Sequence, residues 1–187
     1  FMSNFFLNFI IPKSITLILI LSSVYVFPQQ LIFDNQITIS SGDDGYGRPR
    51  VELINNQPII IFRNNTSPKT IKIAKWNGSG FNAAYSITDT GIMPSSQDGP
   101  EVAVFGDTIY VVFSSSATAY TSIMMIRSFD AGSTFSDTIR VSETIPSQIC
   151  RMGNVTVDNL GNPVISYMSY SINSVSYTHL TLPTIMP

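Results

Sequence analysis

The feature that most constrains the fold of this chain is an internal repeat with a period of about 50 residues. Three segments begin with similar short strands, at residues 50–53, 101–104 and 154–157. Val51 and Val102 lie 51 residues apart, and Val102 and Val155 lie 53 apart. Each segment continues through a turn rich in Asn, Asp or Gly and returns as an apolar, β-branched strand. Such turn residues supply the positive φ angles that tight hairpins need.

The repeat predicts four strands in each complete unit. Third strands are expected at residues 70–74 and 122–127, and fourth strands at 85–88 and 138–142. Residues 36–40 resemble another fourth strand. Four strands per roughly 50 residues, with no helical periodicity in residues 28–174, are typical of propeller blades. We predict an all-β fold: an incomplete β-propeller of about two and a half four-stranded antiparallel blades. A β-sandwich is the alternative, but it does not explain the repeat.

The N-terminal segment, residues 1–27, is predicted to be a signal peptide. Residues 5–27 are almost entirely apolar, and Lys13 is their only charge. A positive residue followed by an apolar run is typical of secretory signals. The alternative is an uncleaved membrane anchor, because about 20 apolar residues can cross a bilayer. The protein is therefore expected to be secreted or at the cell surface, with membrane contact only through this segment if it is uncleaved.

The C-terminal tail, residues 175–187, is predicted to be non-native. Residues 175–184 match the conceptual translation of a transposase-type sequencing adaptor at every position. His179, the only histidine, lies within this match and is excluded as a candidate general base. The repeat-bearing part of the chain is then residues 28–174, which we expect to be the N-terminal part of a longer propeller.

Composition excludes several classes of partner and cofactor. Ten Lys and Arg residues against twelve Asp and Glu give a net charge of −2, so no basic field for nucleic acid is expected. One Cys and one His cannot form an intrachain disulfide or a Cys/His metal cluster. We expect neither a metal nor a cofactor.

A short motif lies between the expected third and fourth strands of the second unit: Ser128-Phe-Asp130-Ala-Gly132-Ser-Thr134-Phe135. Asp130 can accept hydrogen bonds from the backbone of its own turn, and Gly132 permits a left-handed backbone. The pattern resembles the Asp-box, also called the BNR repeat, of sialidases and related propellers. A degenerate copy, residues 75–81, precedes it in phase, because Phe81 and Phe135 lie 54 residues apart. We interpret Asp130 as a structural turn residue rather than a catalytic carboxylate.

The resemblance to sialidase-like propellers implies a specific catalytic set, which this chain matches poorly. The family uses three arginines, a Tyr–Glu pair and an Asp acid/base. Its first arginine lies in an Arg-Ile-Pro motif, whereas Arg48 here directly precedes Pro49. The loop expected to hold the acid/base, residues 63–69, contains no carboxylate. We therefore assign no catalytic residue.

Positions just ahead of each inner strand should gather around one end of a propeller. These positions are Arg48, Arg50, Glu101 and Asn154. We hypothesise that they bind a polar ligand, although solvated loop residues are the alternative. The leading prediction is a non-catalytic module that binds a glycan or a surface protein. The alternative is an exo-α-sialidase-type glycoside hydrolase whose main catalytic residues lie beyond this sequence.

Overall fold

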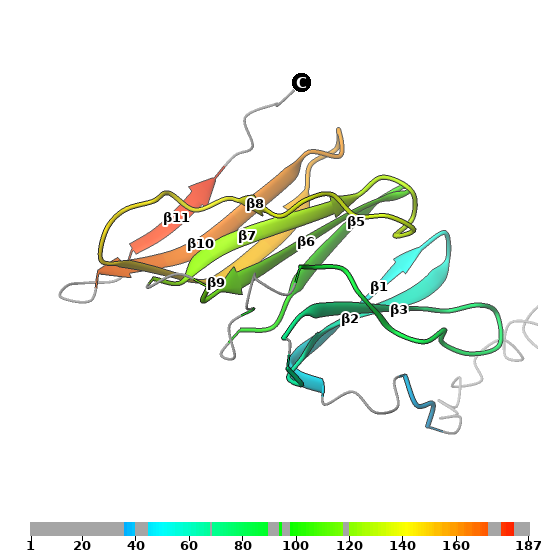
Figure 1. Cartoon of the computed structure of the whole chain (residues 1–187). Helices are drawn as coiled ribbons and strands as arrows, with labels where there is room; N and C mark the ends of the chain where they lie inside the picture. The colour runs from blue at the N-terminus through cyan, green and yellow to red at the C-terminus, as the bar shows by residue number, and fades with distance from the viewer. Residues whose placement is uncertain are drawn as a thin grey trace, which may run out of the picture. The chain divides into compact units, whose positions relative to one another are not determined.

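The computed structural model describes residues 36–39, 48–67, 69–89, 94, 98–117 and 120–171, and the backbone alone of 45–47 and 177–181. The predicted signal peptide at 1–27 lies outside the described residues. Within them, no helix is long and apolar enough to cross a membrane. The described elements are strands β1 to β11, which form three antiparallel sheets (Figure 1).

The first two sheets each contain four strands in sequence order. The first contains β1 (Gly45–Ile54), β2 (Gln57–Asn64), β3 (Ile71–Lys75) and β4 (Tyr85–Ser86). The second contains β5 (Glu101–Phe105), β6 (Thr108–Ser115), β7 (Ser122–Ser128) and β8 (Ile139–Arg140). Strands are paired with their sequence neighbours, as they are in a propeller blade.

The third sheet contains three strands in the order β11-β10-β9. These are β9 (Gln148–Val157), β10 (Pro163–Ser171) and β11 (Tyr177–Thr181). Two four-stranded sheets and part of a third confirm the prediction of an all-β, incomplete β-propeller. Strand β11 lies in the segment predicted to come from an adaptor. Its pairing does not test that prediction, because strand ladders use backbone groups that every non-proline residue carries.

One strand prediction is wrong in the described part of its range. Residues 36–39 do not form a strand. A strand needs a hydrogen-bonded partner, and the described third strands, β3 and β7, already pair with β4 and β8. The fourth strands are also shorter than expected, with two residues each.

The hairpin turns form where the sequence supplies residues that tolerate positive φ. Asn55 and Asn56 have φ of 50° and 58° between β1 and β2. Gly106 has φ 57° between β5 and β6, and Gly161 has φ 82° between β9 and β10. These angles match the left-handed geometry of tight hairpin turns.

The core lies between neighbouring sheets. One apolar cluster joins the first and second sheets and includes Ile61, Ile73, Ile109 and Phe113. A second cluster joins the second and third sheets and includes Val112, Ile123, Ile165 and Tyr167. The middle sheet is therefore covered on both faces, which explains the unbroken apolar run in β6. Burial of each large apolar side chain contributes about 1.5–3 kcal/mol.

Candidate functional site

Two regions contain the candidate site residues. The first, which we call the strand-start cluster after the strand starts predicted from the repeat, lies in the middle of β1, before and at the start of β5, and in the second half of β9. It contains Arg48, Arg50, Asp98, Glu101 and Asn154. The second is the turn between β7 and β8, residues 128–135, together with a pocket beside it. The two regions share no residue.

Arg50 and Glu101 form an ion pair between the first two sheets. Arg50 Nε donates to Glu101 Oε2 at 2.6 Å, and Arg50 Nη2 donates to Glu101 Oε1. The hydrogen bond to Glu101, with the carboxylate charge, raises the pKa of Arg50 against the opposing effect of burial. The two side chains are 32% and 16% exposed. Both charges are therefore engaged with each other, in the two-pronged geometry that Arg favours with carboxylates.

Arg48 and Asn154 are exposed, but the prediction that they precede the inner strands is wrong, because β1 begins at Gly45 and β9 at Gln148. Arg48 lies at the irregularity in the β1–β2 register. The Arg48 backbone packs against Gly99, where an added Cβ would lie 2.5 Å from the Arg48 carbonyl oxygen. Asn154 pairs with Ser166 across the β9–β10 ladder. Among the described residues, neither Arg48 nor Asn154 has a side-chain hydrogen bond to the Arg50–Glu101 pair. The structure therefore brings two of the four predicted residues into direct contact and leaves the other two side chains in solvent.

Asp98 is a residue of this cluster that sequence reasoning missed. Its side chain is buried, with 7% of the residue exposed. Asp98 Oδ2 accepts hydrogen bonds from Ser114 Oγ at 2.9 Å and from Met152 N at 3.2 Å. Met152 has φ 53°, which is uncommon for a residue with a side chain. Asp98 precedes Gly99 and Pro100, a pattern that indicates an exposed turn. The sequence therefore contains no sign that this carboxylate is buried.

In the β7–β8 turn, Asp130 accepts hydrogen bonds from three other residues. Asp130 Oδ1 accepts from Ser128 Oγ at 2.8 Å, Ser133 N at 2.9 Å and Thr134 N at 2.8 Å. Asp130 Oδ2 accepts from Thr134 Oγ1 at 2.6 Å. The bonds from Thr134, then that from Ser128, lower the pKa of Asp130 well below its ordinary value. Gly132 has φ 76° in the same turn. Asp130 thus organises the turn through a network of charge-assisted hydrogen bonds.

The β7–β8 turn also docks on the first sheet. Lys75 Nζ donates to Ala131 O at 2.7 Å, and Tyr85 Oη donates to Gly132 O. Burial and the charge of Asp130 raise the pKa of Tyr85, so its hydroxyl remains a donor. Phe135 packs against the core cluster between the two sheets. The turn therefore holds two of its carbonyl groups where the neighbouring sheet can bind them.

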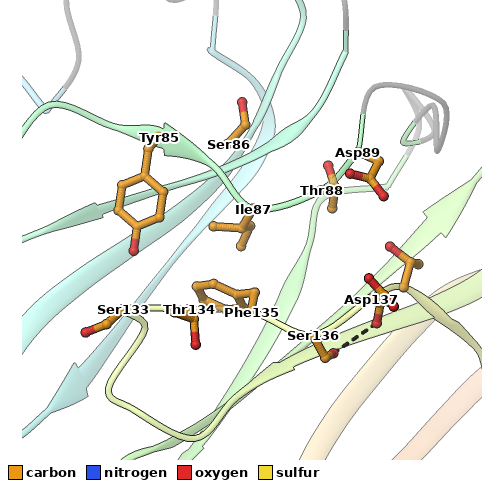
Figure 2. Close-up of a pocket in the computed structure, with 11 residues that line it drawn as sticks. Tyr85, Ser86, Ile87, Thr88, Asp89, Ser133, Thr134, Phe135, Ser136 and Asp137 are labelled. Atoms are coloured by element: carbon orange, nitrogen blue, oxygen red, sulfur yellow. Dashed lines mark hydrogen bonds between the residues drawn. The ribbon is translucent and has the colours of Figure 1, made fainter.

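A pocket of about 360 Å³ lies beside this turn (Figure 2). It is lined by residues 85–89, which include β4 and the segment after it, and by residues 133–138, which lead into β8. In Figure 2, the Ile87 and Phe135 side chains face each other across the pocket, and the Tyr85 hydroxyl points toward the β7–β8 turn. Ser136 Oγ donates to Asp137 O at 2.9 Å. The pocket is thus formed by two sheets.

Among known proteins, the chain is similar only to solved structures. No family model matches the chain, and no curated protein matches it. The solved structure of the Hadza microbial sialidase Hz136 matches at 18% identity and a TM-score of 0.55, over 74% of this chain and 35% of that one. A thermostable family-43 glycoside hydrolase matches at 16% identity and a TM-score of 0.53, over 80% of this chain and 52% of that one. The chain therefore spans about a third to a half of these structures, and the likeness establishes the fold.

Proposed function

We propose that this chain is part of a secreted or cell-surface, sialidase-like propeller that binds glycans without hydrolysing them. The similarity in fold to two glycoside hydrolases supports a ligand rich in sugar hydroxyls. The N-terminal apolar segment supports export. A surface protein is the other partner class that this architecture suits, and it becomes the leading one if no glycan binds.

The Arg50–Glu101 ion pair is the observation that carries the non-catalytic assignment. Both oxygens of Glu101 accept hydrogen bonds from Arg50, and this bidentate pair holds the carboxylate against the guanidinium. Asp98 accepts from Ser114 and Met152, which favours a positioning role. The loop after β2, residues 63–69, contains no carboxylate. In contrast, Arg48 and Asn154 are exposed and carry the donors that bind sugar hydroxyls.

The test is a glycan array probed with the wild-type chain, Arg48→Ala and Asn154→Ala. We expect each variant to bind at least about fivefold more weakly, since each loses one or more ligand hydrogen bonds. Arg140→Ala is the matched control, because Arg140 is exposed at β8 and lies outside the strand-start cluster. Unchanged binding in both test variants would remove the strand-start cluster as the ligand site.

The alternative function, an exo-α-sialidase, is favoured by one feature, the buried carboxylate of Asp98 at the start of β5. A fluorogenic sialoside distinguishes the two functions. We expect no hydrolysis by the wild-type chain. Hydrolysis that disappears in Asp98→Asn, while the array profile stays the same, would replace the binding function with the enzymatic one.

A further inference from the structure

The pocket between residues 85–89 and 133–138 contains no residue of the strand-start cluster. It is formed by the outermost strand of the first sheet and by the segment that follows the β7–β8 turn (Figure 2). The pocket can therefore bind a ligand whether or not the strand-start cluster does. At about 360 Å³, its volume falls in the lower part of the ~300–1,000 Å³ range of small-molecule sites.

The polar groups that line the pocket divide into two sets. Some are already used within the protein: Thr88 Oγ1 accepts from Ile71 N at 3.0 Å, and Thr134 Oγ1 donates to Asp130. Asp89 and Asp137 are exposed, and among the described residues neither carboxylate has a hydrogen-bond or ion-pair partner. The hydroxyls of Ser133 and Thr138 are likewise without a partner in the described part of the chain. The second set is thus available to a ligand.

The apolar part of the pocket is also suited to a flat, partly apolar ligand. The Tyr85 ring is held in place through its hydroxyl, which donates to Gly132 O, and the residue is 39% exposed. Ile87 is buried, and Phe135 packs against the core. An immobilised aromatic ring loses little conformational entropy when it contacts a ligand. A sugar ring is a ligand of this kind, because its C–H face is apolar and its edge carries hydroxyls.

The charge of this region limits the ligand further. Asp89, Asp130 and Asp137 place negative charge on or beside the pocket. Three cations of the two sheets have other interactions. Lys75 donates to Ala131 O, and Arg140 donates to the Ser142 and Glu143 carbonyls. Lys72, which is paired with Ser86 in the β3–β4 ladder, also has an interaction of its own. Anionic ligands are therefore repelled, whereas the hydroxyls of a neutral ligand can donate to the carboxylates.

We propose that this pocket is a second ligand site, which binds a neutral, hydroxyl-rich ring such as one sugar unit of an uncharged glycan. Asp89 and Asp137 accept hydrogen bonds from the ligand hydroxyls, Ser133 and Thr138 complete the polar contacts, and Tyr85 contacts the ring face. The site excludes acidic sugars, so it differs in selectivity from a sialic-acid site.

The experiment is a binding titration of the full chain, followed by saturation-transfer NMR. The probes are N-acetylglucosamine and galactose as neutral sugars, N-acetylneuraminic acid as an acidic sugar, and calcium chloride. We expect the neutral sugars to bind and the acidic sugar to remain unbound in the Arg48→Ala/Asn154→Ala background, which lacks both exposed donors of the strand-start cluster. The double variant Asp89→Asn/Asp137→Asn should bind neutral sugar about tenfold more weakly, because it loses hydrogen bonds to charged acceptors.

Glu143→Gln is the matched control, since it removes one exposed carboxylate outside the pocket. Ser133→Ala is the second test variant and leaves both carboxylates in place. Melting curves that coincide with wild type establish that each variant is folded. Three results would overturn the proposal: no neutral sugar bound by the Arg48→Ala/Asn154→Ala chain, equal affinity in the Asp89→Asn/Asp137→Asn variant, or calcium binding without sugar binding.

Discussion

The turn between β3 and β4 and the turn between β7 and β8 occupy the same place in neighbouring blades, but they are built differently. In the first, Asn77 Oδ1 accepts from Ser79 N, Ser79 Oγ and Gly80 N, each at 3.0 Å. The Trp76 and Phe81 rings close it in an edge-to-face pair, with centroids 5.3 Å apart. In the second, the Asp130 carboxylate takes the corresponding acceptor role.

The two turns also differ in what surrounds them. An added Cβ on Gly78 or Gly80 would have nothing within 4 Å, whereas one on Gly132 would lie 3.1 Å from Ile109 Cδ1 and 3.4 Å from Ile73 Cδ1. A turn in open space needs hydrogen-bond partners only for its own backbone groups, and the side-chain amide of Asn77 provides them. A turn that docks must also hold its carbonyls in register with another sheet. We interpret the ionised carboxylate of Asp130 as the device that provides this rigidity.

The largest expected effect concerns the core beneath the docked turn. Ile73→Ala should lower the free energy of unfolding by about 2–5 kcal/mol, because Ile73 is fully buried between the first two sheets and against Gly132. Leu53→Ala is the control, since Leu53 is 60% exposed and should change stability by about 0.5 kcal/mol or less. Urea unfolding measures both. Equal values for the two variants would contradict a docked interface at this position.

Substitution of one glycine in each turn compares the two turns directly. Gly132→Ala should cost about 2–4 kcal/mol, because its φ of 76° strains a side chain and the new Cβ crowds Ile109. Gly78→Ala, with φ 100° and open space, should cost about 1 kcal/mol from backbone strain alone. The same unfolding assay applies. A larger loss at Gly78 would mean that the β3–β4 turn is the more constrained of the two.

The charge of Asp130 predicts a pH dependence that an amide cannot have. Its pKa is lowered by folding, so its stabilisation is complete above the unfolded value of about 3.9 and is lost as pH falls through the lower folded value. Asp130→Asn should therefore lower the melting temperature at pH 7. The difference in melting temperature between variant and wild type should become smaller as the pH approaches 2. Asp158, whose pKa is also lowered, contributes equally to both chains and cancels in this comparison. A constant difference across that range would argue against an ionised turn.

The smallest expected effect is the loss of one docking hydrogen bond. Lys75→Met removes the bond to Ala131 O and keeps most of the apolar stem, so the cost should be about 0.5–1.5 kcal/mol. Lys69→Met is the matched change at an exposed lysine outside the docked turn, and it should leave the unfolding midpoint unchanged. Equal midpoints for the two variants would show that the lysine contact contributes nothing to docking.

Much of the fold could be predicted because its signals are local. Alternating and apolar runs located most strands, and Asn, Asp and Gly marked their turns. The prediction for residues 36–39 was wrong because a strand depends on a partner that no local pattern reveals. Strand β9 begins at Gln148, six residues before the expected Asn154, because its first half continues the pairing with the end of β10.

Less of the candidate sites than of the fold could be predicted from the sequence. The repeat predicted that Arg50 and Glu101 begin neighbouring inner strands, which is correct for Glu101 and wrong for Arg50, because β1 begins at Gly45. The sequence by itself determined the repeat, the strand pattern and the residues able to build each turn, since these follow from backbone preferences over a few residues. The tertiary structure alone decided that Arg50 and Glu101 neutralise each other, that Asp98 is buried, and that residues 85–89 and 133–138 enclose one pocket. These contacts join side chains about 15–55 positions apart, and only the stacking of one sheet on the next brings such side chains together.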